Sequence, residues 1–348
     1  MKTLSDKNSN AFTKVLNRIW KYIKENPIAD MVVLVAIIMC FTVDNFFSMN
    51  NFNDLAGNTA IRLLIALGVS GCLITKGTDL SAGRQVGLAA CITGVLMQRA
   101  DATGKVLKGL GEMNMFVVLG IVLVIGAIIG IANGLIISIL NVPPFIATLG
   151  TQTIIYGIAL IGTDAQPIGS FQRSYTKFVN GAIFRSKEAG GFAGITFLMI
   201  IAVLAGIFFW FLYNKTTHGK YMYAIGGNEN AAEVSGVNTR KSKILIYMTA
   251  GIMYALAGYL LAGKSGGATS SLGTGYELEA IAGCTIGGVS TTGGIGTVGG
   301  ILVGVLVFEL LKIVLQFLGV NPNLNYIVQG LVIVVAVALD IRKYLAKK

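Results

Sequence analysis

Residues 116–140 read FVVLGIVLVIGAIIGIANGLIISIL, and this apolar stretch decides the fold class. It holds no charged residue and is long enough, as an α-helix, to cross a hydrocarbon layer about 30 Å thick. Similar runs recur along the chain, which is 54% hydrophobic and 12% charged. Soluble domains carry about 25% charged residues. The sequence therefore predicts an all-α polytopic membrane protein, and the continuous rather than alternating runs argue against a β-barrel.

The apolar runs predict about ten transmembrane helices. Residues 28–348 would form a single transmembrane domain, with spans at approximately 28–47, 56–75, 84–98, 116–140, 145–162, 194–212, 244–263, 278–292, 297–318 and 324–341. In residues 1–27, apolar side chains from Phe12 to Ile23 follow helical spacing with Lys and Arg between them. This pattern predicts an interfacial helix on the cytoplasmic leaflet before the first span.

Positive charge is concentrated in three segments. The formal net charge is +11, and of 27 Lys and Arg, six lie in residues 1–27, five in 213–243 and four in 342–348. Basic residues near span ends mark the cytoplasmic side of a membrane protein. We therefore expect both termini and the 213–243 loop in the cytoplasm, and we expect no nucleic-acid partner.

The chain contains a weak internal repeat. GAIIGIANGLIISILNVPPF (126–145) resembles GILVGVLVFELLKIVLQFLGVNPNL (300–324). Each of these segments is preceded by a polar, Gly-containing segment, GTDLSAG (77–83) in the first half and GYELEAIAG (275–283) in the second. The spans that follow these polar segments are short. An inverted repeat with short, broken helices at matching positions is typical of transporters, so we predict a 5+5 inverted repeat. Alternatively, any two Gly-rich apolar helices look alike. Gly126, Gly130 and Gly134 fall four apart, and this spacing predicts that they let helices pack closely.

Charged and polar side chains gather beside the two expected breaks. Such groups are costly inside a membrane and often line a substrate path. We predict translocation pathway or gate roles for Asp79, Ser81, Arg84, Gln85, Glu277 and Glu279. The alternative is that Asp79 and Arg84 form an ion pair that only fixes the broken helix. Glu309 and Lys312, three residues apart on one helix, favour a structural pair.

No catalytic or metal site is predicted. The chain has a single histidine, His218, and its four cysteines lack CxxC spacing. Residues 258–265, GYLLAGKS, match the P-loop pattern GxxxxGK[ST]. A true P-loop follows a β-strand and opens a soluble helix, whereas this segment ends an apolar run and contains bulky residues. The chain is therefore expected to be a transport subunit without its own ATPase site.

A polar, basic island at residues 213–243 reads YNKTTHGKYMYAIGGNENAAEVSGVNTRKSK. A short helix with alanines and a following glycine offers a small, smooth face that fits a groove on another protein. We predict coupling to an ATPase through Asn228, Ala231, Ala232, Ser235 and Gly236. The alternative is an ordinary basic loop.

Five segments carry a resemblance to a known family. They are ALGVSGCLITKGTDLSAGRQVGLAA, NVPPFIATLGT, YAIGGNENAAEVSGVN, YELEAIAGCTIGGVSTTGG and VALDIRKYLAKK. The chain resembles the permease subunits of bacterial ABC sugar importers, in the ribose/xylose/galactose branch, and the galactose/methyl-galactoside members most closely. The coupling residues Ala231, Ala232 and Gly236 match a shortened EAA-type motif, although Asn230 stands before the first alanine.

The resemblance implies a permease that imports a monosaccharide, with galactose or methyl galactoside favoured. It implies a homodimer in the bacterial cytoplasmic (inner) membrane. It also implies a cytoplasmic ABC ATPase subunit and an extracytoplasmic sugar-binding protein. No cofactor is expected in this chain, because ATP and Mg²⁺ would bind the ATPase. The alternative function is a self-sufficient, ion-coupled secondary sugar transporter with Asp79 as its ion site, and a membrane-embedded enzyme lacks any supporting motif.

Overall fold

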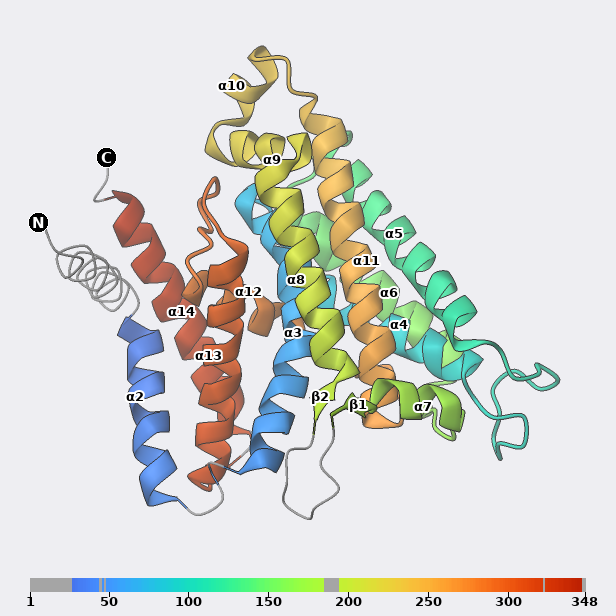
Figure 1. Cartoon of the computed structure of the whole chain (residues 1–348). Coiled ribbons are helices and arrows are strands. Elements are labelled where there is room, and N and C mark those ends of the chain that lie inside the picture. Colours follow the sequence, from blue (N-terminus) through green and yellow to red (C-terminus); the bar gives the residue numbers. More distant parts are fainter. Residues whose placement is uncertain (1–26, 44–45, 47, 185–193, 322, 346–348) are drawn as a thin grey trace, which may run out of the picture.

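The computed structural model describes residues 27–43, 46, 48–184, 194–321 and 323–345 (Figure 1). The expected interfacial helix of residues 1–27 lies outside this part of the chain, apart from residue 27. The described chain is a helical bundle with one short antiparallel hairpin, in which β1 (Ala182–Ile183) pairs with β2 (Ile195–Thr196). This confirms the predicted all-α class.

A helix occupies each segment expected to span the membrane. These helices are α2 (Pro27–Thr42), α3 (Met49–Ile74), α4 (Ala82–Leu96), α5 (Met115–Ser138), α6 (Pro144–Thr163), α8 (Phe197–Lys215), α11 (Thr239–Ser265), α12 (Tyr276–Ile286), α13 (Val298–Phe317) and α14 (Leu324–Leu345). Within the described residues, six helices are long and apolar enough to cross a membrane: α3, α5, α6, α8, α11 and α13. The number of complete crossings stays a prediction.

Short polar residues start several of these helices. The Ser48 side chain accepts a hydrogen bond from Asn51 N at α3, and the Asn114 side chain accepts one from Phe116 N at α5. Each satisfies a backbone amide that the first helical turn would otherwise leave free. Among the described residues, three shorter helices lie outside the expected spans: α7 (Arg173–Val179), α9 (Thr217–Gly227) and α10 (Glu229–Val234).

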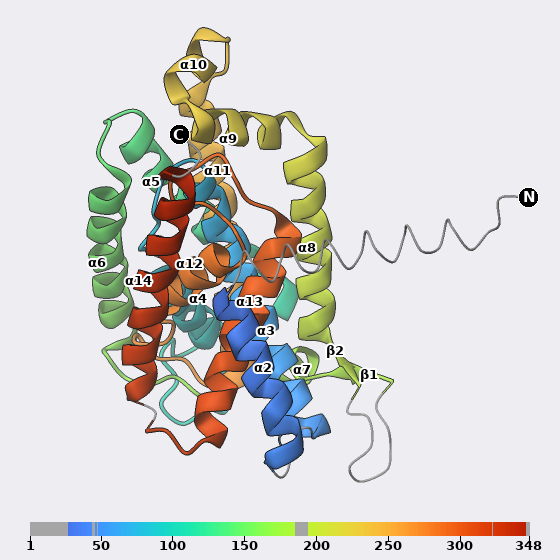
Figure 2. The ribbon, with the colours of Figure 1, turned by 90° about the vertical axis from the view of Figure 1, so that its left-hand side faces the viewer.

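Helix pairings in the two halves correspond. α5 packs on α11 as α13 packs on α3, and α4 packs on α6 as α12 packs on α14. α4 also contacts α11 as α12 contacts α3. These contacts are those expected if α3, α4, α5 and α6 are equivalent to α11, α12, α13 and α14. The pairing therefore supports the predicted repeat, and its inversion stays a prediction. Figure 2 shows α2 and α14 on the near face of the bundle, in front of α12 and α13.

Glycines allow α5 to lie directly against α11. A Cβ atom added to Gly126 would stand 2.4 Å from the carbonyl oxygen of Gly251, and one added to Gly130 would stand 2.2 Å from that of Tyr247. Gly134 meets the same helix at Ile244. Small residues on one face let membrane helices approach at backbone distance. The packing role predicted for these glycines is confirmed.

The polar segments separate to opposite ends of the bundle. Figure 1 shows α9, α10 and the C-terminal end of α14 at the upper end, and α7 with the β1–β2 hairpin at the lower end. The 213–243 loop and the C-terminal end of α14 thus lie on the same side of the bundle, which agrees with the charge distribution.

Candidate functional site

The first break, residues 75–81, is organised by a buried carboxylate. Asp79 is 1% exposed, and its Oδ1 atom accepts hydrogen bonds from the Ser81 amide at 3.0 Å and the Ser81 hydroxyl at 2.6 Å. A side chain that bonds the backbone two residues ahead fixes a local turn. Asp79 therefore holds the turn from which α4 begins.

The Ser81 hydroxyl joins this turn to two helices. It accepts from the Gln85 Nε2 atom of α4 at 2.8 Å and from the Asn133 Nδ2 atom of α5 at 2.9 Å. The Gln85 Oε1 and Asn133 Oδ1 atoms are buried without a partner among the described residues. Sequence reasoning missed Asn133, although an amide in the otherwise apolar 116–140 run was an available signal.

Helix α6 contacts the same break through Thr148. Its hydroxyl accepts from Leu80 N at 3.1 Å and lies 3.1 Å from the Thr78 carbonyl oxygen. Thr148 is fully buried. The break therefore contacts α5 and α6 through neutral polar groups, which hold its conformation without a basic partner.

Arg84 points away from this cluster. Its guanidinium lies 4.0 Å from the ring centroid of Tyr156, and its Nη1 atom is 3.4 Å from the Ser270 carbonyl oxygen. Within the part of the chain that the structure describes, Asp79 and Arg84 form no ion pair. The structure thus lacks the pair that the alternative interpretation of the break required.

The second break, residues 266–275, meets the first. Glu277 is 8% exposed, and its Oε2 atom lies 2.0 Å from the position that a Cβ atom on Gly83 would take. A Cβ atom on Gly87 would stand 2.4 Å from the Leu272 carbonyl oxygen. The first turns of α4 and α12 therefore touch through glycine, and Glu277 lies in the contact between them.

Glu279 belongs to a four-charge cluster. The Arg62 Nε atom is 2.6 Å from Glu279 and 2.5 Å from Glu309, and the Lys312 Nζ atom is 3.0 Å and 3.4 Å from the same carboxylates. The predicted pair of Glu309 and Lys312 is confirmed, but it is half of a larger cluster. We call these four residues the charge cluster; its formal charge is zero.

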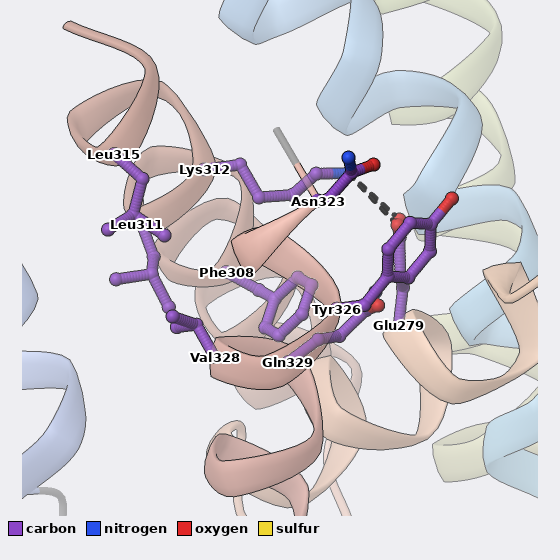
Figure 3. Close-up of a pocket in the computed structure, with 9 residues that line it drawn as sticks. All are labelled: Glu279, Phe308, Leu311, Lys312, Leu315, Asn323, Tyr326, Val328 and Gln329. Carbon is purple, nitrogen blue, oxygen red and sulfur yellow. Dashed lines mark hydrogen bonds and ion pairs between the residues drawn. The ribbon is translucent and has the colours of Figure 1, made fainter. Parts of the chain in front are cut away.

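A pocket of about 310 Å³ lies beside the charge cluster, between α13 and the first turns of α14 (Figure 3). Lys312 of α13 and Glu279 of α12 reach toward one another, and Asn323, Tyr326 and Gln329 come from the segment that leads into α14 and from α14 itself. Leu311, Leu315, Val328 and Phe308 supply the apolar walls. Glu279 is the predicted pathway residue that lines this pocket, whereas Asp79, Ser81, Gln85 and Glu277 lie buried at the breaks.

The predicted coupling residues shape α10. Asn228 Oδ1 accepts from Ala231 N at 3.1 Å at the start of the helix, and the Ser235 hydroxyl donates to the Ala231 carbonyl oxygen at 2.7 Å at its end. Gly236 then turns the chain with φ +87°, a conformation that glycine adopts without steric cost.

The outer face of α10 differs from the predicted one. Ala231, Ser235 and Gly236 are exposed, but Ala232 is only 5% exposed and packs inward. Val234 is 91% exposed at the tip. Ala232 therefore packs against the rest of the chain, and Val234 is an exposed apolar side chain that sequence reasoning did not single out.

The segment matching the P-loop pattern is helical. Residues 258–265 form the last turns of α11, where Tyr259 and Leu260 are buried. Lys264 donates to the Asn58 side chain. Helical backbone amides cannot wrap a phosphate, so this segment is not a nucleotide site.

The relatives found among known proteins are import permease proteins. The galactose/methyl galactoside import permease protein MglC of Haemophilus influenzae is 44% identical over 95% of this chain and 98% of its own length. That of Escherichia coli K12 is 44% identical over 94% of this chain and 97% of its own length. The ribose import permease protein RbsC of Bacillus subtilis is 36% identical over 92% of this chain and 93% of its own length. No solved structure matches the chain significantly.

A family model supports the same conclusion. The model described as "Branched-chain amino acid transport system / permease component" matches residues 51–337, from the start of α3 to well inside α14. This range includes both breaks, the charge cluster and α10. The chain therefore belongs to this family of multi-pass membrane permease components, and it is a transport subunit rather than an enzyme.

Proposed function

We propose that this chain is the membrane permease subunit of an ATP-binding-cassette importer for a monosaccharide, with galactose or methyl galactoside as its substrate. The observation that carries the proposal is the 44% identity to the Haemophilus influenzae permease, which extends over 95% of this chain and 98% of that protein. The family model's description names amino acids instead, whereas the MglC and RbsC relatives are sugar permeases.

The energy for import is proposed to enter through α9 and α10. Residues 258–265 are helical, so ATP would bind a separate cytoplasmic ATPase. The exposed Val234 and Ala231 would fit a groove on that subunit, and the ion pair of Lys243 with Glu229, at 2.5 Å, ties α10 to α11. Movement of the ATPase would thus reach the bundle through α11, which packs on α3, α4 and α5.

The proposal includes two further partners. An extracytoplasmic binding protein would deliver the sugar at the end opposite α10, and a second copy of the chain would complete the translocation path. The upper end in Figure 1, with α9, α10 and the end of α14, would face the cytoplasm. The basic residues of the 213–243 loop and of 342–348 support this orientation.

The test is transport by the reconstituted system. We would purify the permease with an ABC ATPase and a sugar-binding protein from the same organism, and measure uptake of radiolabelled galactose, ribose and leucine into liposomes. Uptake of galactose that requires ATP and both partners is expected. Uptake by the permease alone, or ATP-driven uptake of leucine but not of a sugar, would contradict the proposal.

The second candidate is an ion-coupled secondary transporter. The observation in its favour is Asp79, a buried carboxylate that accepts hydrogen bonds from the Ser81 amide and hydroxyl. Sugar uptake that follows a proton or sodium gradient without ATP, and that disappears in Asp79→Asn, would support it.

A further inference from the structure

We infer that the pocket between α13 and α14 is a weak binding site for one neutral monosaccharide during its passage through the permease. This inference rests on the proposed function, because it identifies where the imported sugar contacts the chain. It concerns the residues of Figure 3, of which Glu279 alone was predicted as a pathway residue.

The charge cluster determines which ligands the pocket accepts. Glu279 and Lys312 line the pocket, but each is already paired: Lys312 lies 3.0 Å from Glu279, and Glu279 lies 2.6 Å from Arg62. With Glu309 the cluster holds two positive and two negative groups. A sugar phosphate or an amino-acid zwitterion brings charged groups that would each need an opposite charge in the pocket that is not already paired. The cluster offers none, and an unpaired charge that is removed from water is costly. A neutral ligand needs none.

The remaining lining groups suit a polyhydroxylated ring. Gln329 and Asn323 carry amides, which both donate and accept hydrogen bonds and so match hydroxyl groups in either orientation. Tyr326 supplies an aromatic ring, against which the C–H face of a sugar can pack. Tyr326 is 70% exposed in the free chain, so its ring is accessible from outside the bundle. Apolar walls with a few convergent polar groups are typical of small-molecule sites.

Size and position agree with one sugar ring in transit. At about 310 Å³ the pocket is at the lower end of the range for small-ligand sites, about 300–1,000 Å³. It lies where α13 ends and α14 begins, toward the lower end of the bundle in Figure 1, away from α10. In the proposed orientation this is the side on which the binding protein delivers sugar. An accessible, shallow site there would bind weakly and release its ligand readily.

The experiment measures binding to the full-length permease directly. The chain would be placed in lipid nanodiscs without its partners, and saturation-transfer difference NMR would be recorded with the sugar that the reconstituted importer transports. Galactose 6-phosphate and leucine serve as comparison ligands. The variants are Tyr326→Ala and Gln329→Ala, with Tyr326→Phe as the conservative partner. Val334→Ala, which changes a residue of α14 that is 66% exposed and outside the pocket, is the matched control.

We expect signals from the neutral sugar but not from the phosphate or leucine. Tyr326→Ala and Gln329→Ala should each weaken binding about tenfold, the factor for one lost hydrogen bond or ring contact, while Tyr326→Phe and Val334→Ala leave it unchanged. Absence of sugar signals from the wild-type permease, or equal signals from all variants, would overturn the inference. The proposed function is judged separately, because the complete wild-type importer would still show ATP-driven uptake.

Discussion

The charge cluster provides a prediction whose size follows from burial. Of the two cations in the cluster, Arg62 lies closer to the carboxylates: its Nε atom is 2.6 Å from Glu279 and 2.5 Å from Glu309. The Arg62 side chain is 12% exposed. Glu309 is 2% exposed. In Arg62→Ala, Glu309 would keep only the more distant Lys312, at 3.4 Å. Removing one member of a buried pair costs about 3–5 kcal/mol, since it leaves an uncompensated buried charge.

The matched comparison is Lys312→Ala. Lys312 is 25% exposed, and after its removal both carboxylates still contact Arg62. We expect this variant to lose about 1.5–3 kcal/mol, the range for a hydrogen bond to a charged group. The double variant Arg62→Ala/Glu309→Gln should regain part of the Arg62→Ala loss, because the buried carboxylate is then neutral. Coupling energies of about 0.5–3 kcal/mol are typical for residues in contact.

The measurement is unfolding of the purified permease in mixed lipid–detergent micelles, with the free energy of unfolding compared among the four proteins. The order wild type, Lys312→Ala, double variant, Arg62→Ala is expected from most to least stable. If Arg62→Ala is no less stable than Lys312→Ala, or if Glu309→Gln brings no recovery, the carboxylates do not depend on Arg62 in the way the distances indicate.

Three other predictions follow from single contacts. Gly130→Leu should prevent folding, because its Cβ would stand 2.2 Å from the Tyr247 carbonyl oxygen, while Gly120→Leu on the same helix, with nothing within 4 Å, should express normally. Ser81→Ala should lower the free energy of unfolding by about 2–4 kcal/mol, since the buried Gln85 and Asn133 amides lose their common acceptor. Val234→Asp should reduce ATP-driven uptake at least tenfold without lowering permease stability, because Val234 is 91% exposed; unchanged uptake would exclude α10 as the coupling contact.

Much of the fold could be predicted because its signals are periodic and long. Each apolar run became a helix, and the weak repeat between 126–145 and 300–324 appears as equivalent pairings of α5 and α13. The glycine spacing of α5 was readable for the same reason. The helix ends were harder to predict. A span to residue 292 was expected, but α12 ends at Ile286 because residues 287–297 form a loop.

The site was harder to predict because its contacts join distant residues. Arg62 and Glu279 are 217 positions apart, and no local pattern brings them together. The nearness of Asp79 and Arg84 in sequence suggested an ion pair, but α4 directs Arg84 toward Tyr156. Ala232 was chosen for its small side chain, and only the packing of α10 shows that it faces inward.

The two halves of the repeat share a backbone arrangement but differ in chemistry, and this difference bears on how the permease can work. At the first break Asp79 is held by the neutral Ser81, which also accepts from Gln85 and Asn133. At the second, Glu279 is held by Arg62 and Lys312 beside an accessible pocket. The fully buried network around Asp79 loses its hydrogen bonds when it moves, whereas charged side chains beside a pocket can be hydrated while they move. We therefore expect α4 to stay fixed during transport and α12, α13 and α14 to rearrange around the sugar.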